Sequence, residues 1–556
     1  MNCFRHVRLA LAAILVFASV LTISAASRPN IIVIMADDMG YSDLGCYGGE
    51  IRTPSIDRLA ENGLRFTQFY NTSRCCPTRA SLLTGLYPHQ AGVGRMTFDE
   101  GLPGYQGTLS RNAVTIAEVL RTAGYSTAMV GKWHLSLTKS TPDNALWVSH
   151  RLGLGEFSDL DSYPTARGFD EYWGTIWGVV NFFDPFSLVH NTTPVRSVPK
   201  DFYYTDAISD KAVEYIEKYG KGEKPFFLYV AHSAPHWPLH ALPEDIAKYQ
   251  DTYNAGWDKI REARYRRMVQ MDLIEADSAV LSERHEKEVR WDENPHREWD
   301  ARAMAVHAAM VDRLDQGVAR ILAKLEAMEQ LDNTLILFLS DNGASPERPE
   351  KFGPGFDRPS HLRDGTPIRY AVDKKVLPGP ADSYAGIGPM WANASNTPFR
   401  YWKKEQYEGG IATPLIAHWP GGMVAKEGSI TAQPGHVVDI MATAAELAGA
   451  RHPKTSRGLK VMPVEGRSLA PIFRGESRPA GEPLYWEHFG GRAVRQGDWK
   501  LVALKDEPWE LYDLATDRTE TRDVAAKHPE RVEELSALWQ SWAERAQVFP
   551  RPKPRP

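Results

Sequence analysis

The chain has 556 residues and a formal net charge of −5 at pH 7, so it is long enough for a large core and too long for one simple domain. Hydrophobic residues make up 43% and charged residues 24% of the chain, which is ordinary for a folded, soluble protein. The slightly acidic balance gives no reason to expect nucleic acid binding. The one short basic stretch, Arg551–Arg555, is interpreted as a disordered end.

The first segment, residues 1–26, has the pattern of a secretory signal. A basic start precedes an apolar stretch over residues 9–23, and Ser24-Ala25-Ala26 offers a small-residue cleavage site. An uncleaved anchor is the alternative, although the stretch is short and terminal for a membrane span. No other window is apolar enough to cross a bilayer. We therefore expect an exported protein, periplasmic or secreted after cleavage near Ala26, with no stable membrane partner.

The first predicted element of the mature chain is a strand over Ile31–Met35. Five consecutive apolar residues without alternation are typical of a strand that is buried on both faces. Asp37 and Asp38 follow this strand almost directly. An Asp-Asp pair is also a common turn former, so it does not indicate a site by itself.

The next informative segment is the run Cys75-Cys76-Pro77-Thr78-Arg79. Pro77 fits the first position of a helix, because its missing N–H has no partner to lose there. Such a helix start directs free N–H groups and the positive dipole end toward the cysteines, which favours a thiolate or another anion. The donor fork of Arg79 suits an oxyanion. The run therefore predicts an anion-handling site around Cys75.

The cysteine content is low. The chain has 4 cysteines, and Cys3 belongs to the predicted signal. Three remaining cysteines do not make a disulfide scaffold. Whether Cys46 and Cys76 pair is left open by the sequence.

Three further apolar runs end in polar residues: Thr127–Val130, Phe226–Val230 and Leu335–Leu339. Helical patterns separate the runs. Residues 116–123 read as a helix with Thr115 as N-cap and Gly124 as its stop, and an apolar stripe spans residues 304–325. The alternation predicts an α/β fold with a large, mostly parallel mixed sheet flanked by helices. In such a sheet the ligand lies beyond the carboxyl ends of the strands.

That rule brings a set of polar side chains to one edge of the sheet: Asp37, Asp38, Lys132, His134, His236, Asp341 and Asn342. Each alone is more simply a turn former or a buried structural histidine. Four such groups at matching strand ends, together with the Cys75 run, favour a site. Three carboxylates and one amide oxygen suit Ca²⁺ first and Mg²⁺ second, rather than zinc. A divalent ion would also offset the repulsion between the carboxylates.

After residue 450 the sequence changes character. Residues 451–480 are rich in Pro, Gly, Arg and Ser and indicate a connecting segment. Short strands are predicted at 483–487, 491–495, 499–502 and 509–512, and a helix at 528–545. We therefore divide the chain into a signal (1–26), a catalytic domain (27–450) and a C-terminal subdomain (451–556) with an antiparallel sheet and a terminal helix.

Several segments resemble one family. The Cys75 run, followed by Leu82-Leu83-Thr84-Gly85, resembles the modification motif of type I sulfatases. The same resemblance extends to Asp37–Gly40, Gly131–His134, Ala234–Leu239 and Ser340–Gly343, and the stretch Asn396–Gly410 resembles the sulfatase segment with the last catalytic lysine. Lys403 fits that lysine better than Lys404. Along nearly its whole mature length the chain resembles type I sulfatases of the alkaline-phosphatase-like superfamily, and most of all bacterial arylsulfatases.

The resemblance implies that Cys75 is oxidised to formylglycine (3-oxoalanine) by a formylglycine-generating enzyme. It implies hydrolysis of aryl or alkyl sulfate esters to an alcohol and inorganic sulfate, through a formylglycine sulfate-ester intermediate. It also implies a metal site made by Asp37, Asp38, Asp341 and Asn342, with the modified Cys75 as a further ligand of Ca²⁺ or Mg²⁺.

The resemblance also implies roles for the cationic and imidazole side chains. Arg79 and Lys132 would steady the hydrated aldehyde and the transferring oxyanion. His236 and Lys403 would bind the sulfate, with Lys132, and help to protonate the departing alcohol. His134 would take a proton from the second hydroxyl of the hydrated aldehyde.

Other functions stay open. The substrate could be a sulfated polysaccharide, and a phosphonate or phosphodiester hydrolase of the same superfamily could use a similar edge of the sheet. If Cys75 stays unmodified, the protein could be a silent binder of sulfated glycans. A redox or soft-metal role for Cys75-Cys76 is the least favoured, because no Cys-x-x-Cys pair or added His ligand is evident.

Overall fold

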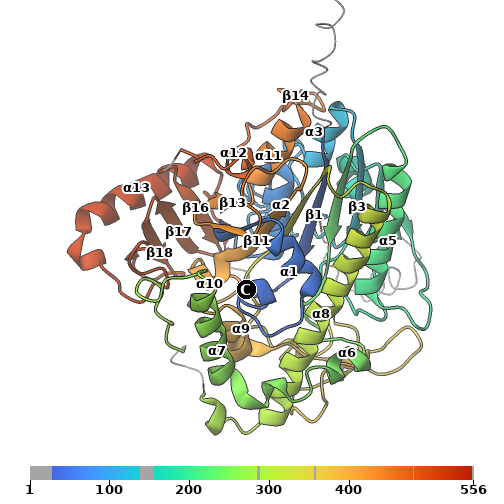
Figure 1. The fold of residues 1–556 in the computed structure, drawn as a ribbon, viewed down its shortest axis with the longest axis vertical. Helices are drawn as coiled ribbons and strands as arrows, with labels where there is room; N and C mark the ends of the chain where they lie inside the picture. The colour runs from blue at the N-terminus through green and yellow to red at the C-terminus, as the bar shows by residue number, and fades with distance from the viewer. Residues whose placement is uncertain (1–27, 138–155, 285–288, 356–357, 480, 554–556) are drawn as a thin grey trace, which may run out of the picture.

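The computed structural model describes residues 28–553, apart from 138–155, 285–288, 356–357 and 480. A large central sheet with helices around it lies beside a smaller C-terminal sheet (Figure 1). The predicted signal lies outside the described residues. Within the described ranges, no helix is both long and apolar enough to cross a bilayer.

The central sheet has eleven strands in the order β12-β2-β11-β8-β1-β7-β3-β4-β5-β6, with β13 paired to β2. Their bounds are β1 (Asn30–Ala36), β2 (Leu64–Tyr70), β3 (Ser126–Gly131), β4 (Glu171–Thr175), β5 (Leu188–His190), β6 (Thr193–Pro194), β7 (Phe226–Ala231), β8 (Thr334–Ser340), β11 (Ala412–His418), β12 (Ser429–Thr431) and β13 (Gly435–His436). The four predicted strands are β1, β3, β7 and β8, which are adjacent and parallel at the centre. Strands β11, β5 and β6 pair antiparallel, so the sheet is mixed, as predicted.

Burial explains why these four strands could be predicted from the sequence. Every residue of β1, β7 and β8 is buried, because helices cover both faces of the sheet. A strand of this kind needs apolar side chains at every position rather than at alternate ones. Since the four strands are parallel, their carboxyl ends reach the same edge of the sheet.

Two groups of helices cover the sheet (Figure 1). Helices α1 (Pro54–Glu61), α5 (Tyr204–Gly220) and α8 (Arg297–Ala327) pack together on one face, and α2 (Cys75–Thr84), α3 (Ile116–Thr122) and α11 (Asp439–Ala448) pack on the other. Thr115 caps α3 as predicted and forms a capping box with Glu118. Gly124 follows the helix with φ 85°, the left-handed conformation expected of a stop.

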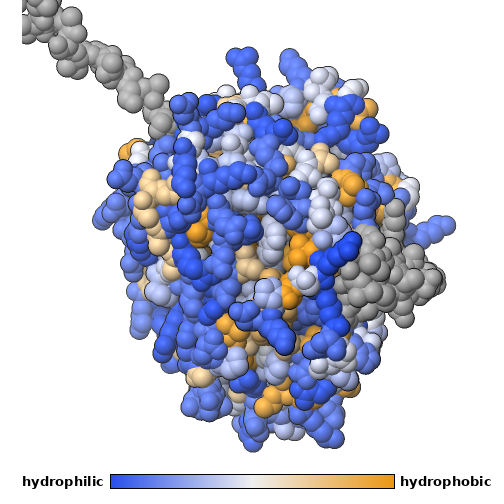
Figure 2. All heavy atoms as spheres, turned by 90° about the vertical axis from the view of Figure 1, so that its right-hand side faces the viewer, coloured by the Kyte–Doolittle hydropathy of each residue, from blue (hydrophilic) through white to orange (hydrophobic). Residues whose placement is uncertain are grey.

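The remaining elements are short or lie at the periphery. Apart from short 3-10 helices and the C-terminal elements, they are α6 (Pro243–Ala247), α7 (Gly256–Gln270), α9 (Gly388–Ser395), α10 (Glu408–Ile411), α12 (Ala470–Phe473) and the strand pairs β9 (Arg369–Tyr370) with β10 (Ser383–Tyr384) and β14 (Thr455–Ser456) with β15 (Leu459–Lys460). Figure 2 shows the face at the right of Figure 1, which is mainly hydrophilic with scattered apolar side chains. Outside the atoms drawn in grey, the described residues on this face form no single large apolar patch.

The C-terminal sheet is antiparallel, as predicted. Its strands β16 (Leu484–His488), β17 (Gly491–Gln496), β18 (Trp499–Ala503) and β19 (Glu510–Asp513) pair in sequence order. Helix α13 (Pro529–Arg545) packs on β17 and β18 and buries Leu535, Trp539 and Trp542 in a second core.

Two predictions about the C-terminal part are corrected. Residues 451–480 are more than a connector, because Leu469, Ile472 and Phe473 are buried in the main core and α12 packs on α11. The predicted disordered end is corrected at Arg551, whose guanidinium lies 5.2 Å from the ring centroid of Phe549; residues 554 and 555 of that prediction lie outside the described residues. A cation over an aromatic ring at such a site contributes about 0.5–1 kcal/mol.

Candidate active site

The centre of the site is an oxygen cluster at the ends of β1 and β8. These strands are parallel neighbours with Ala36 opposite Ser340, so Asp37-Asp38 and Asp341-Asn342 come together. The backbone N–H of Asp38 donates to Oδ1 of Asp341 at 3.2 Å, and Nδ2 of Asn342 donates to Oδ1 of Asp38 at 2.7 Å. All four side chains are buried. The structure thus brings the four predicted oxygen ligands together.

The donor set fits a hard divalent cation. Among the described residues, Oδ1 of Asp37 and Oδ1 of Asn342 are buried without a hydrogen-bond partner. A buried polar atom without a partner costs about 1–3 kcal/mol, and more when it is charged. Burial and the neighbouring Asp341 raise the pKa of Asp37 well above its usual range. A bound cation would relieve both penalties, since carboxylate and amide oxygens are what Ca²⁺ and Mg²⁺ prefer.

Helix α2 begins at Cys75, and Arg74 is the residue that precedes the helix. The prediction that Pro77 is the first helical residue is therefore wrong by two positions. The first N–H groups of a helix have no intrahelical acceptor, so a residue without an N–H is tolerated at any of them. The first helical bond runs from the N–H of Thr78 to the carbonyl of Arg74 at 2.9 Å. The free amides of the helix start are those of Cys75 and Cys76 themselves.

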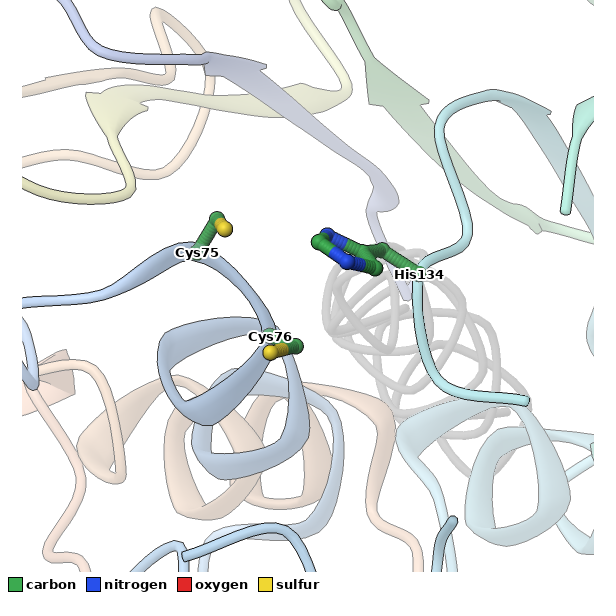
Figure 3. Close-up of side chains that lie close together, drawn as sticks. All are labelled: Cys75, Cys76 and His134. Carbon is green, nitrogen blue, oxygen red and sulfur yellow. The ribbon is translucent and has the colours of Figure 1, made fainter. Parts of the chain in front are cut away.

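Cys75 points toward His134 across the site, and Cys76 lies beside them on the helix (Figure 3). Ligand atoms of these three side chains lie within 4.8 Å of one another. A hydrogen bond from Cys76 and the nearby cation Lys132 hold the pKa of Cys75 well below its usual range. Burial lowers the pKa of His134 to about 4, so the ring is neutral at pH 7. In the described part of the chain all three cysteines, Cys46 included, are free thiols.

Two fully buried cations are bonded to the oxygen cluster. The guanidinium of Arg79 donates to Oδ2 of Asp341 through Nε at 3.2 Å and Nη2 at 2.8 Å. Its Nη1 donates to the carbonyl of Lys132 at 3.1 Å. Nζ of Lys132 donates to Oδ2 of Asp37. Arg79 and Lys132 therefore hold Asp37 and Asp341 in place and offset their charge.

Lys403 and His236 form the opposite side of the site. Nζ of Lys403 lies 2.8 Å from Oδ1 of Asp38 and 3.2 Å from Nε2 of His236. Nδ1 of His236 is 2.5 Å from the carbonyl of Trp237 and must carry the ring hydrogen, because a carbonyl only accepts. Burial lowers the pKa of His236 to about 3, which agrees with a neutral ring whose Nε2 accepts from Lys403. Lys403 is buried, whereas Lys404 is exposed, so the structure separates the two candidates.

Glu347 is a site residue that sequence reasoning missed. Its Oε1 is bonded to Nη1 of Arg74 at 3.1 Å, its Oε2 accepts from Nε1 of Trp237 at 2.6 Å, and Oε2 lies 3.7 Å from Nζ of Lys403. Against the effect of burial, Arg74 and Lys403 hold the pKa of Glu347 well below its usual range. The one available signal was its place six residues after Asp341, beyond the end of the same strand.

The loop that carries Lys403 is hydrogen-bonded to the loop that precedes Cys75. The N–H of Lys404 donates to the carbonyl of Ser73 at 2.7 Å, and Nε2 of Gln406 donates to Oγ of Ser73 at 3.2 Å. Ser73 stands two residues before Cys75. The two loops are therefore positioned together.

Behind this loop lies a buried ion cluster, Glu408, Lys500, Arg518 and Glu520, named the Glu408 cluster. Nζ of Lys500 lies 2.8 Å from Oε1 of Glu408 and 2.7 Å from Oε1 of Glu520. The guanidinium of Arg518 also pairs with Glu408, and the N–H of Glu408 donates to Oε2 of Glu520 at 2.7 Å. Lys500 is on β18. The C-terminal sheet therefore fixes the start of α10, at the end of the Lys403 loop.

Acidic and amide oxygens lie at the ends of two central parallel strands and face the buried thiol of Cys75 at a helix start. This arrangement is that of a hydrolase of the alkaline-phosphatase-like superfamily. The family model "Sulfatase" matches residues 29–450, and "N-sulphoglucosamine sulphohydrolase, C-terminal" matches residues 399–544. The chain belongs to the sulfatase family; it is a type I sulfatase, a hydrolase of sulfuric esters.

Individual relatives agree over most of the chain. An uncharacterized sulfatase of Schizosaccharomyces pombe is 34% identical, covering 92% of this chain and 93% of its own. An arylsulfatase of Klebsiella aerogenes is 32% identical, covering 81% and 93%. The crystal structure of Ps i-CgsB in complex with k-i-k-neocarrahexaose is 26% identical, with a TM-score of 0.65 and coverage of 94% and 98%.

Proposed function

We propose that this sulfatase cleaves sulfate esters with an oxidised Cys75 as its nucleophile and a divalent cation in the oxygen cluster. The observation that carries the proposal is the position of Cys75. Its side chain is buried at a helix start, faces neutral His134 and is surrounded by Lys132, Arg79 and the oxygen cluster. Formylglycine at Cys75 would supply a hydrated aldehyde: one hydroxyl attacks sulfur, and loss of the proton of the second hydroxyl then re-forms the aldehyde as the C–O bond to sulfate breaks.

The cation would be held by Asp37, Asp38, Asp341 and Asn342, with Ca²⁺ preferred over Mg²⁺. When bound, it supplies positive charge that polarises the sulfate and lowers the pKa of the attacking hydroxyl. The oxygens of Asp37 and Asn342 that have no hydrogen-bond partner among the described residues support this assignment.

Arg79, Lys132 and His134 act on the nucleophile side. Arg79 and Lys132 fix the carboxylates of Asp341 and Asp37 by direct hydrogen bonds. Their own positions are fixed in turn, so these two cations are already in place to stabilise the negative charge of the bound sulfate. Because burial lowers the pKa of His134 to about 4, its neutral ring is available as a base at pH 7.

Lys403 and His236 act on the leaving-group side. Asp38 and Glu347 outweigh burial and raise the pKa of Lys403 above its usual range, so it is an ammonium at neutral pH. His236 has no hydrogen to give at Nε2, because its ring hydrogen lies at Nδ1. The proton for the departing alcohol therefore comes from Nζ of Lys403, directly or through Nε2 of His236 at 3.2 Å.

The substrate class we propose is a sulfated glycan, with small aryl or alkyl sulfates as simpler substrates of the same centre. The complex of Ps i-CgsB with a neocarrahexaose supports the glycan assignment. A pocket of about 830 Å³ beside the site gives a sugar leaving group space.

The test combines two variants with peptide mass spectrometry. Cys75→Ala should abolish hydrolysis of 4-nitrophenyl sulfate, whereas the matched variant Cys76→Ala should keep most of it. Trypsin releases Cys75–Arg79, because arginines precede Cys75 and end the segment. In active protein this peptide should have lost one sulfur and two hydrogens and gained one oxygen. Fully active protein with an intact thiol at Cys75 would refute the proposal.

A further inference from the structure

The pocket beside the site lies between the two parts of the molecule. One wall includes Arg74, next to Cys75 in the chain, and Glu347, whose Oε2 lies 3.7 Å from Nζ of Lys403. The facing wall comes from the C-terminal sheet, through residues 488–491 and 504–507. A group attached to a sulfate ester at Cys75 therefore extends between the catalytic domain and the C-terminal sheet.

The tip of the β16–β17 hairpin forms part of this wall and carries an unexpected residue. Its two central residues, Phe489 and Gly490, have φ of 50° and 97°. Both values are positive, as in a type I′ turn, where Asn-Gly or Gly-Gly fits without strain. A bulky side chain in the left-handed region costs on the order of 1 kcal/mol or more. A strained residue in the wall of a pocket indicates that its side chain contacts the molecule that the pocket binds.

The ring of Phe489 is held as a fixed platform. The guanidinium of Arg95 lies 5.2 Å from the ring centroid, and the ring of His488 meets it edge-on at 4.5 Å. The side chain is half-buried and lines the pocket. An aromatic ring that is fixed and partly exposed offers an apolar face to the C–H face of a sugar ring.

The charged side chains that line the pocket indicate whether it binds a charged or a neutral sugar. Its described lining includes five Arg or Lys side chains and five Asp or Glu side chains, so the charges balance. A sugar hydroxyl both donates and accepts hydrogen bonds and suits such a mixed wall. A second sulfate or a carboxylate would meet as many acidic as basic groups. The lining therefore favours an uncharged ring.

We propose that this pocket binds a neutral sugar ring next to the sulfated unit of the substrate, stacked on Phe489. The inference rests on the proposed sulfatase chemistry and names the leaving-group side of its substrate. It predicts that monosulfated neutral disaccharides are better substrates than the same disaccharides with a second sulfate on the neighbouring ring.

The variant Phe489→Asn tests the platform without harming the fold, because Asn suits this turn. It should keep or raise the melting temperature and leave kcat/KM for 4-nitrophenyl sulfate unchanged. With a panel of monosulfated neutral disaccharides, kcat/KM should fall about tenfold, mainly through KM, as expected for one lost stacking contact. The matched control is Arg457→Asn in the β14–β15 hairpin, where Arg457-Gly458 has φ of 52° and 74° away from this pocket. Arg457→Asn should change neither the hydrolysis of 4-nitrophenyl sulfate nor that of the disaccharides.

The outcomes separate the two proposals. If the unaltered protein fails to hydrolyse 4-nitrophenyl sulfate, the proposed chemistry is wrong. If it hydrolyses that ester but none of the disaccharides, prefers the disulfated ones, or is unaffected by Phe489→Asn on the disaccharides, the sugar pocket is wrong. An equal loss on both substrates would also reject the platform.

Discussion

Nζ of Lys403 lies 3.2 Å from Nε2 of His236, and the hydrogen between them belongs to the lysine. The carbonyl of Trp237 fixes the ring hydrogen of His236 at Nδ1, and the carboxylate of Asp38 anchors the ammonium at 2.8 Å. A proton held between a lysine and a neutral imidazole can pass to an oxygen that departs beside them.

Lys403→Ala should slow the enzyme most where the leaving alcohol needs a proton. We expect a loss of about a hundredfold or more in kcat/KM with alkyl sulfates, and a smaller loss with 4-nitrophenyl sulfate, whose phenolate leaves unaided. Lys404→Ala, at the exposed neighbouring position, is the control. A loss that does not depend on the leaving group would contradict the role of Lys403 as the proton source.

Glu347→Gln should shift the alkaline limb of the pH–rate profile to lower pH. Glu347 helps to raise the pKa of Lys403, so removal of this negative charge lowers that pKa and the ammonium is lost earlier as pH rises. A fall in kcat of about tenfold should accompany the shift, because Arg74 loses its partner as well. Glu405→Gln removes a nearby carboxylate and should leave the limb in place. The measurement is kcat/KM between pH 8 and 12, because the pKa of Lys403 in the unaltered protein lies above its usual range.

Removal of the divalent cation should abolish activity and lower the melting temperature. A chelator should inactivate the protein, and Ca²⁺ should restore it better than Mg²⁺. At a hundred times its dissociation constant, a bound ion adds about 2.7 kcal/mol of stability. Asn342→Ala should shrink the Ca²⁺-induced rise in melting temperature, whereas Asn254→Ala, at an exposed position, should not. Full activity in chelator would reject the cation site.

Lys500→Met should destabilise the fold strongly. It leaves the carboxylates of Glu408 and Glu520 buried with one cation fewer, and loss of one partner of a buried ion pair costs about 3–5 kcal/mol. Adding Glu520→Gln should recover part of that loss. Lys505→Met, with a 62% exposed side chain, is the matched control and should change stability little. Unfolding in urea measures all three; an unchanged midpoint for Lys500→Met would contradict the cluster's role.

Stability should fall as the pH drops below about 6.5, in part because of His436. Burial lowers the pKa of His436 to about 3, and its ring centroid lies 5.8 Å from those of Tyr87 and Trp486. Below pH 6.5 the unfolded chain binds a proton at this histidine, and the folded chain does not. Each further pH unit therefore lowers the free energy of unfolding by up to about 1.4 kcal/mol. His436→Asn should make the fall in the free energy of unfolding between pH 6 and 4.5 shallower by up to that amount per pH unit. His528→Asn, at a partly exposed position, is the control. Identical slopes for all three proteins would refute this assignment.

The central strands and the residues that follow them were predictable because their environment is uniform. Strands β1, β3, β7 and β8 are covered on both faces, so their sequences are continuous apolar runs. Parallel strands end at one edge of a sheet, and this rule is enough to predict that Asp37-Asp38 and Asp341-Asn342 lie together. Lys403 was found by resemblance alone, because no local pattern separates it from Lys404.

Other features depend on contacts that no local pattern records. Glu347 joins the site because the chain after β8 reaches Arg74, 273 positions away in sequence. The start of α2 was misplaced because proline, although most common at the first helical position, is tolerated throughout the first turn. Glu408 and Lys500 read as ordinary charged residues until the fold brings them 2.8 Å apart over 92 positions.

The Glu408 cluster has a consequence for exchanging parts between sulfatases. Glu408 belongs to the active-site loop, whereas Lys500, Arg518 and Glu520 belong to the C-terminal part, and the four charges of the cluster cancel. A chimera that joins the first 450 residues of this chain to the tail of a relative keeps that balance only if the relative brings matching bases. We therefore expect such a chimera to fold only when the buried charges at this boundary still cancel.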